Sequence, residues 1–279
     1  MTDHPRIPLA AVIGSPVAHS RSPAVHGYWL RQYGIPGYYI PVDIAARDLS
    51  EAMRAMHKMG FVGCNVTIPH KEAALALADS ASETAVSIGA ANTMTLAADG
   101  SIFADNTDGY GFIANLRAGA PLWRPEAGPA AVIGAGGAAR AIVHSLLAEG
   151  VPEVRIANRT RARAEALRDD FGPRLTVVDW AEAADMFDGA ATVVNTSSLG
   201  MQGKAEFDIA LDALSAAAVV TDCVYTPLET PLLRGAAARG CVTVDGLGML
   251  LHQAVPGFER WFGHRPEVTE DLRLQVFSA

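Results

Sequence analysis

The sequence predicts an α/β protein with two domains, each built on a mainly parallel sheet. The chain has 279 residues, which exceeds the usual size of a single hydrophobic core. Short apolar runs alternate with helical segments along nearly its whole length, as expected for strands joined by crossover helices. The pattern changes near residue 107, because strands and helices alternate more regularly in the middle third that follows.

The first third of the chain predicts one of these domains. Strands are expected at 9–13, at 38–42, in a run that ends at Val66, at 92–96 and at 102–104. Helices are expected over about 22–34 and 49–59, and from about His70 and Ser82. We expect Ser22 to cap the first helix and Pro23 to occupy its first turn, where no amide hydrogen bond is lost.

The middle of the chain predicts a second sheet that helices cover on both faces. Apolar, β-branched runs occur at 130–133, 153–157, 176–178, 192–195, 219–222 and 242–244. Continuous apolar strands that alternate with helices are typical of such a sheet. After Asp245-Gly246 a helical tail runs through Gln253 and Trp261, and Pro256 is expected to kink it because proline has no amide hydrogen. A last helix is expected from about 271 to 277.

The composition excludes several classes of protein. A net charge of −8 argues against nucleic-acid binding, and no apolar run approaches the ~20 residues that cross a bilayer. The start of the chain lacks the layout of a signal peptide. Cys64, Cys223 and Cys241 form no CxxC pair, and the eight histidines form no HExxH cluster, so we predict neither a disulfide framework nor a metal. We expect a cytoplasmic protein.

A glycine-rich turn in the middle of the chain predicts a dinucleotide site. Gly134, Gly136 and Ala139 match the pattern G-x-G-x-x-G/A between a strand and a helix. The first glycine permits a tight turn, the second lets the backbone approach a pyrophosphate, and the alanine allows close helix packing. The amides of the helix start then bind the phosphates. The turn residues expected to contact cofactor are Gly134, Ala135, Gly136, Gly137 and Ala138. The alternative is a turn that serves packing alone.

The residues after the next strand favour NADP over NAD. An NAD enzyme usually has a carboxylate there for the ribose 2′-hydroxyl, whereas this chain has Asn158-Arg159-Thr160, followed by Arg161 and Arg163. A guanidinium binds a 2′-phosphate through paired, charge-assisted hydrogen bonds. The alternative, a solvated start of a helix, fits Arg161 better than it fits Arg159.

Two motifs in the first third carry candidate catalytic groups. Lys71 follows a strand and a proline turn and opens a helix, where a cation is locally unfavourable. Asp108 lies at a second turn and can neutralise that lysine. Reduction of a ketone needs such a proton donor while the cofactor supplies hydride. Alternatively, Lys71 is solvated and Asp108 only caps a helix.

The ordered series of motifs closely resembles that of the shikimate dehydrogenase family. The matching segments are Gly14 to Pro23, Asn65-Val66-Thr67 with Pro69 and Lys71, Gly89 to Thr93, Asn106-Thr107-Asp108, Asn195 to Met201, Asp222 with Tyr225 and Pro227, and Asp245-Gly246 through Met249-Leu250 to Gln253. One departure is His26-Gly27, where the family has His-Asn.

The resemblance implies a function and a set of site residues. The reaction would be NADPH-dependent reduction of 3-dehydroshikimate to shikimate, on the route to chorismate and the aromatic amino acids, with Lys71 and Asp108 as the catalytic pair. The substrate-binding residues would be Ser20 and Ser22 for the carboxylate with Tyr225 nearby, and Thr67, Asn92 and Gln253 for the ring hydroxyls or ketone. Thr196 and Gly246 would join the cofactor site.

The predicted domains follow from this assignment. Residues 1–107 and 246–279 would form the substrate-binding domain and residues 108–245 a Rossmann-type NADP-binding domain, with a cleft between them. We expect a monomer or homodimer that acts on a small molecule and contacts neither nucleic acid nor membrane. Two alternatives stay open: a relative that uses quinate or aminoshikimate, possibly with NAD, and a non-catalytic NADP-binding sensor. Retention of Lys71 and Asp108 argues against the sensor.

Overall fold

The computed structural model describes residues 7–278, which divide into two compact units. The first unit runs up to Thr107 and resumes at Leu251, and the second unit spans Asp108–Leu250. The return to the first unit was expected at 246, earlier than observed. Gly246 and Gly248 explain the difference, because both pack inside the second unit: a Cβ at Gly246 would lie 2.6 Å from the backbone of Cys223.

The described residues of the first unit form a six-stranded sheet in the order β2-β1-β3-β5-β6-β4. The strands are β1 (Leu9–Gly14), β2 (Tyr38–Asp43), β3 (Phe61–Val66), β4 (Ser80–Ala81), β5 (Thr93–Leu96) and β6 (Ile102–Asp105). β1 pairs in parallel with β2 and β3, as β4 does with β6, but β5 is antiparallel to both of its neighbours. The sequence did not predict this reversal. It follows from the short turn at Gly100 between β5 and β6, because a parallel crossover needs a dozen residues or more.

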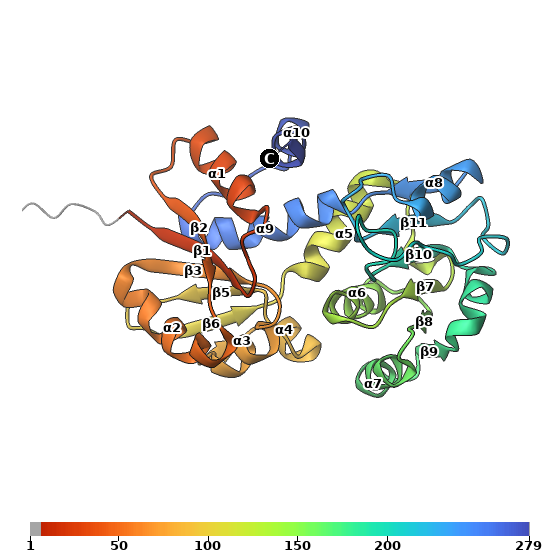
Figure 1. Cartoon of the computed structure of the whole chain (residues 1–279), viewed down its shortest axis with the longest axis horizontal. Helices are drawn as coiled ribbons and strands as arrows, with labels where there is room; N and C mark the ends of the chain where they lie inside the picture. Colours follow the sequence, from red (N-terminus) through yellow and green to blue (C-terminus); the bar gives the residue numbers. More distant parts are fainter. Residues whose placement is uncertain (1–6, 279) are drawn as a thin grey trace, which may run out of the picture. The chain divides into compact units, whose positions relative to one another are not determined.

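Helices cover both faces of the first sheet. They are α1 (Ser22–Gln32), α2 (Leu49–Met56), α3 (Lys71–Leu77), α4 (Glu83–Ile88), α10 (Glu270–Ser278) and the later part of α9 (Leu247–Phe262), with short 3-10 turns η1 (Ala46–Asp48) and η2 (His57–Met59). Met53 of α2 and Ala74 of α3 pack with Cys64 of β3 in one core. Helix α1 and the later part of α9 lie on the other side (Figure 1). There Trp29 of α1 and Phe258 of α9 have ring centroids 5.3 Å apart.

Helix α9 continues through Pro256 without a break. Its Trp261 fixes the helix to the sheet, because the indole N–H donates to the backbone carbonyl of Met94 at 3.0 Å. Close approach is possible because the facing strand residue is Gly63, where a Cβ would lie 1.9 Å from the Trp261 indole nitrogen.

Residues 108–250 form a second sheet with the order β12-β11-β10-β7-β8-β9, and all its pairs are parallel, as predicted. The strands are β7 (Ala130–Ile133), β8 (Val154–Ala157), β9 (Leu175–Val178), β10 (Thr192–Asn195), β11 (Val219–Asp222) and β12 (Val242–Val244). The helices are α5 (Asp108–Gly119), α6 (Gly137–Ala148), α7 (Arg161–Phe171) and α8 (Pro231–Ala238), with the 3-10 segments η3 (Pro125–Ala127) and η4 (Trp180–Phe187).

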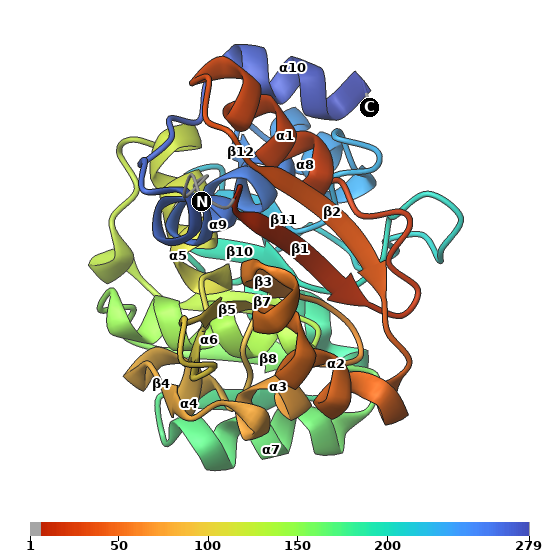
Figure 2. The same ribbon diagram turned by 90° about the vertical axis from the view of Figure 1, so that its left-hand side faces the viewer.

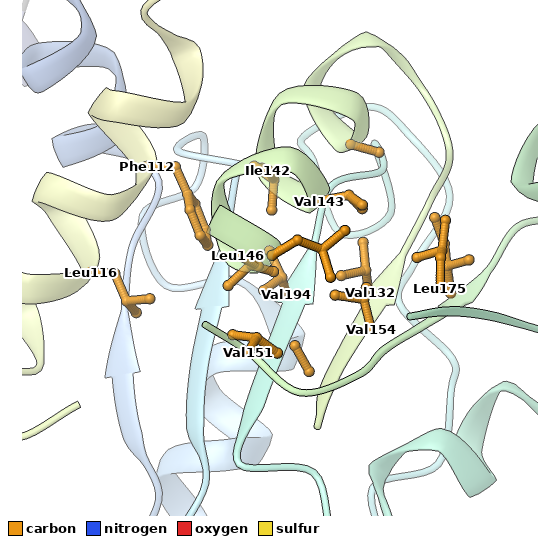
Figure 3. Close-up of a cluster of buried hydrophobic side chains, with 14 of the residues drawn as sticks. Phe112, Leu116, Val132, Ile142, Val143, Leu146, Val151, Val154, Leu175 and Val194 are labelled. Atoms are coloured by element: carbon orange, nitrogen blue, oxygen red, sulfur yellow. The ribbon is translucent and has the colours of Figure 1, made fainter. Parts of the chain in front are cut away.

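Successive residues of β7 pack into hydrophobic cores on opposite faces of this sheet. Val132 packs with Phe112 of α5 and Leu146 of α6 (Figure 3). Its neighbour Ile133 packs with Phe187 of η4 on the other face. The continuous apolar strands predicted from the sequence are therefore buried on both sides. None of the described helices is long and apolar enough to cross a membrane.

Candidate functional site

Ser20 and Ser22 lie in the segment that leads from β1 into α1. Ser22 is the first residue of the helix, and its backbone N–H donates to the Ser20 hydroxyl oxygen at 3.3 Å. The prediction that the Ser22 side chain caps α1 is therefore wrong. Arg21, whose backbone is already helical, holds the cap position without a side-chain cap bond, while Pro23 lies in the first turn as predicted.

Backbone hydrogen bonds bring Thr67 beside this segment. The Thr67 N–H donates to the Ile13 carbonyl at 2.9 Å, and the Ser15 N–H donates to the Ile68 carbonyl at 3.1 Å. A Cβ at Gly14 would lie only 2.5 Å from the Thr67 methyl carbon. The loops that follow the neighbouring parallel strands β1 and β3 thus meet at one edge of the sheet, where α/β folds bind ligands. Figure 2 shows β1 beside β2 and the two strands' common direction.

Lys71 is the first residue of α3, as the sequence predicted. Its backbone carbonyl accepts from the Ala91 N–H at 2.9 Å, and the Val66 N–H donates to the Asn92 carbonyl at 2.8 Å. These bonds place Asn92 next to the loop that carries Thr67 and Lys71.

Asn92 and Gln253 form a buried amide pair. The Asn92 Nδ2 donates to the Gln253 Oε1 at 3.3 Å, and the two side chains are 3 % and 8 % exposed. The Asn92 Oδ1 accepts from the backbone N–H of Thr107 at 2.8 Å and from the hydroxyl of Thr93 at 2.9 Å. A backbone N–H can only donate, so it fixes which end of the Asn92 amide is the oxygen.

In the second unit, the glycine turn between β7 and α6 has the geometry of an anion site. Gly134 adopts a φ of 104°, which favours glycine. Gly136 caps α6 and Gly137 begins it, and a Cβ on either would meet no atom within 4 Å. The space beside Gly136 and Gly137 at the start of α6 is therefore open, and a phosphate bound by helix-start amides fits there. Ala135 and Ala138 complete the turn.

The residues after β8 are tied to this turn by Asn158. Its Oδ1 accepts from the Ala135 N–H at 3.1 Å and its Nδ2 donates to the Thr160 carbonyl at 2.8 Å. Arg161 already forms two ion pairs, with Glu165 at 2.9 Å and with Asp179 at 2.5 Å.

Arg159 and Arg163 differ from Arg161 in this respect. Both are exposed, and within residues 7–278 neither makes an ion pair. Two guanidinium groups near the glycine turn are thus open to an anionic ligand.

Thr196 and Gly246 have packing roles of their own. The Thr196 hydroxyl lies 2.9 Å from the Ile133 carbonyl, to which it donates, and a Cβ at Gly134 would lie 2.8 Å from its oxygen. Gly246 packs against the backbone of Cys223 as described above. Both residues thereby shape the loops at the carboxyl ends of the second sheet.

Asp108 and Tyr225 also belong to the second unit. Asp108 is the buried first residue of α5. Tyr225 is half-buried in the loop after β11. Burial, with Asp222 and Asp108 nearby, raises the pKa of the Cys223 thiol, so this thiol stays protonated.

Asp222 organises the loop that holds Tyr225. The carboxylate accepts from the Asn195 amide at 2.9 Å, the Val224 N–H at 2.9 Å and the Thr230 hydroxyl at 2.7 Å. Burial raises its pKa to about 6, although these donors oppose the shift. In the sequence, Asp222 and Asn195 were recognised only as parts of motifs, and no role was predicted for them. The same is true of Thr93 and Thr107.

The structure thus brings Ser20, Ser22, Thr67, Lys71, Asn92 and Gln253 to one edge of the first unit, while Asp108, Tyr225 and the expected cofactor residues belong to the second. No group of three or more His, Cys, Asp or Glu side chains suited to a metal ion occurs in the described part of the chain.

Three family models match the chain in succession. Residues 12–94 match the shikimate dehydrogenase substrate binding domain, and residues 126–201 match the shikimate / quinate 5-dehydrogenase model. Residues 246–272 match the shikimate 5′-dehydrogenase C-terminal domain. The matched segments cover most of the chain in its natural order.

Individual relatives match over nearly their full length. A shikimate dehydrogenase (NADP(+)) from Cereibacter sphaeroides is 64 % identical over 278 residues, which is 100 % of both chains. The solved shikimate 5-dehydrogenase of Thermus thermophilus, in complex with NADP(H) and shikimate, is 36 % identical with a TM-score of 0.86 and covers 97 % of this chain and 98 % of that one. The quinate dehydrogenase of Corynebacterium glutamicum, in complex with NAD, is 33 % identical with a TM-score of 0.90 and covers 97 % and 99 %.

Proposed function

The chain belongs to the shikimate dehydrogenase family, and from this premise we propose which of its residues carry out the reversible reduction of 3-dehydroshikimate to shikimate with NADPH. The observation that carries the proposal is the buried amide pair of Asn92 and Gln253. These residues are 161 positions apart in the sequence, yet their side chains form a hydrogen bond of 3.3 Å beside the loop of Thr67.

We assign substrate binding to residues whose chemistry fits a hydroxylated carboxylic acid. Hydroxyl groups at a helix start suit a carboxylate, and Ser20 and Ser22 supply them at the start of α1, with Tyr225 as a further donor. Amide and hydroxyl groups both donate and accept, so Thr67, Asn92 and Gln253 suit the ring hydroxyls and the ketone.

Lys71 and Asp108 are the proposed catalytic pair. Bound NADPH supplies the hydride to the ketone carbon. As the C=O π electrons become a lone pair on oxygen, the Lys71 ammonium gives that oxygen its proton, and in the oxidation the Lys71 amine takes the proton back. We assign to the Asp108 carboxylate the roles of orienting the lysine and binding a substrate hydroxyl.

The second unit is the proposed NADP-binding domain and the first unit the substrate-binding domain. The open space over Gly136 and Gly137 supports pyrophosphate binding at the start of α6. The exposed Arg159 and Arg163 are the proposed ligands of the 2′-phosphate, and Asn158, Thr160 and Thr196 hold the surrounding loops.

The discriminating experiment is initial-rate oxidation of shikimate and of quinate, each with NADP and with NAD. Turnover with shikimate and NADP, and little with the other three pairs, supports the proposed assignment. The similarity to an NAD-bound quinate dehydrogenase makes quinate with NAD the second candidate, and efficient turnover of that pair would favour it. Tight NADP binding without any turnover would contradict both and favour a sensor.

We further propose a cytoplasmic location and a monomeric or homodimeric state. The net charge of −8 supports a protein without nucleic-acid partners. Light scattering on the purified chain measures its oligomeric state directly.

A further inference from the structure

A chain of buried hydrogen bonds links Tyr39, whose hydroxyl also contacts the Ser22 side chain, to the amide pair of Asn92 and Gln253. Tyr39 lies on the edge strand β2 and is 7 % exposed. Its hydroxyl donates to the Oδ1 of Asn65 at 2.6 Å. Its ring stacks on the buried ring of His26, with centroids 3.9 Å apart and planes 2° apart, so the phenol is held in place.

In the hydrogen bonds that follow, each side chain donates to the next residue of the chain. Because the Asn65 Oδ1 accepts from Tyr39, the Asn65 Nδ2 points the other way, and it donates to the Asn92 carbonyl and to the Thr93 hydroxyl oxygen, each at 3.2 Å. The Thr93 hydroxyl can then donate its hydrogen to the Asn92 Oδ1 at 2.9 Å, which is nearer than its second neighbour, the Thr107 hydroxyl at 3.2 Å. The Asn92 Nδ2 then faces Gln253.

The Thr107 backbone N–H fixes the far end of this chain on the same Asn92 oxygen. Reversal of the Asn65 amide would set its Oδ1 against the Asn92 carbonyl, and reversal of the Asn92 amide would set its Nδ2 against the Thr107 N–H. Either reversal leaves buried polar groups without partners, so one arrangement dominates.

We propose that Tyr39 is a positioning residue, whose hydroxyl holds Asn65 in place and, through Asn65 and Thr93, holds the Asn92 and Gln253 amides in position for the substrate. This inference rests on the substrate-binding role proposed for Asn92 and Gln253. Without the phenol O–H, the buried Asn65 Oδ1 loses its donor, so Asn65 and the Thr93 hydroxyl to which it donates are held less tightly. Substrate affinity then falls while the residues that carry the chemistry are unchanged.

The test compares Tyr39→Phe with a matched control, Tyr33→Phe. The Tyr33 hydroxyl also makes a hydrogen bond in the first unit, accepting from the Glu267 N–H at 3.1 Å, but it lies outside the chain of bonds. We expect Tyr39→Phe to raise KM for shikimate by about 3–10-fold, with kcat within about twofold and KM for NADP unchanged. Tyr33→Phe should leave all three constants unchanged.

Thr93 provides an independent variant of the same chain. Thr93→Val removes the hydroxyl at nearly constant shape and should raise KM for shikimate in the same way. Thr93→Ser keeps the hydroxyl and should restore KM. A purely structural role would lower the thermal midpoint in Tyr39→Phe and Thr93→Val with KM unchanged, and that result overturns the inference.

Asn92→Ala separates failure of the inference from failure of the proposed site. If Asn92→Ala raises KM for shikimate but Tyr39→Phe and Thr93→Val do not, the positioning role alone is wrong. If Asn92→Ala leaves KM unchanged, Asn92 does not bind substrate, and both the proposed site and the inference are wrong.

Discussion

The side-chain hydroxyl of Thr107 donates a hydrogen bond to the backbone carbonyl of Gln253 at 2.8 Å. The bond joins the segment after β6 to α9 next to the His252 carbonyl, which Pro256 leaves without its helical donor because proline has no N–H. Thr107 therefore holds α9 beside the place where its own hydrogen bonds are interrupted, and it does so at the residue expected to contact substrate.

Replacing Thr107 with valine should loosen this attachment. We expect Thr107→Val to lower the free energy of unfolding by about 0.5–1.5 kcal/mol and to raise KM for shikimate by about 3–10-fold, because Gln253 is then less well placed. Urea unfolding and initial rates measure the two effects. Thr107→Ser keeps the hydroxyl and is the control; if serine and valine behave alike, the hydroxyl does not have this role.

The contact between α9 and β3 depends on Gly63. A Cβ there would lie 1.9 Å from the Trp261 indole nitrogen and 2.3 Å from the Met94 carbonyl oxygen that the indole binds. We expect Gly63→Ala to lower the free energy of unfolding by about 1–3 kcal/mol through overpacking, measured by urea unfolding.

Gly27→Ala is the matched control for this prediction. Gly27 lies inside α1, and a Cβ there would approach only the end of the flexible Arg31 side chain, at 3.3 Å. Alanine should stabilise the helix by about 0.5–1 kcal/mol. Equal effects of the two substitutions would contradict the packing argument at Gly63.

The strand pattern was predictable from the sequence where the chain is most regular. The runs in the second unit are buried on both faces, so their apolar residues are continuous and mark each strand. The direction of β5 was not predictable in this way, because the alternation of strand and helix suggested a parallel sheet throughout. The short turn at Gly100 was the signal that the two strands form a hairpin.

The types of residue at the site were predictable from the sequence, but the hydrogen bonds that hold them in place were less so. Lys71 lies at the start of a helix and Gly134 lies in a glycine turn, and both features can be recognised in the local sequence. By contrast, the bond of Thr107 to Gln253 joins residues 146 positions apart, and no local pattern shows it. Likewise, the Ser22 cap was mispredicted because the backbone of Arg21 already starts the helix.

Arg159 and Arg161 should differ in their effect on cofactor binding. Arg161 is engaged by Glu165 and Asp179, whereas Arg159 is exposed beside the glycine turn. We expect Arg159→Ala to weaken NADP binding by about 1.5–3 kcal/mol with NAD affinity nearly unchanged, since only NADP has the 2′-phosphate. Arg161→Ala should leave both affinities unchanged in a fluorescence titration. Equal losses for NADP and NAD in Arg159→Ala would remove Arg159 from this role.

Asp222 should make stability depend on pH in a defined direction. Burial raises its pKa from 3.8 to about 6, so between these values the folded protein binds the proton more tightly than the unfolded chain does. The contribution of Asp222 to stability therefore decreases as pH rises through this window and levels off above it. Asp222→Asn removes the titration.

This expectation is tested by urea unfolding of both proteins at pH 4.5 and pH 7.5. The free energy of unfolding of the wild type, relative to that of Asp222→Asn, should fall by about 1–3 kcal/mol between the two conditions. A difference that is the same at both pH values would mean that Asp222 does not titrate between them.

Lys71 should control the chemical step. It opens α3, and the carbonyl that accepts from Ala91 belongs to its backbone, so Lys71→Ala keeps this hydrogen bond and should fold. Loss of a general acid lowers kcat by about 10²–10⁴-fold, and NADP affinity should stay the same. Lys71→Arg keeps the charge but holds its proton at neutral pH, so it should be nearly as slow. Near-normal kcat in Lys71→Ala would transfer the proton donation to water or another group, while recovery in Lys71→Arg alone would show that the charge matters and the proton does not.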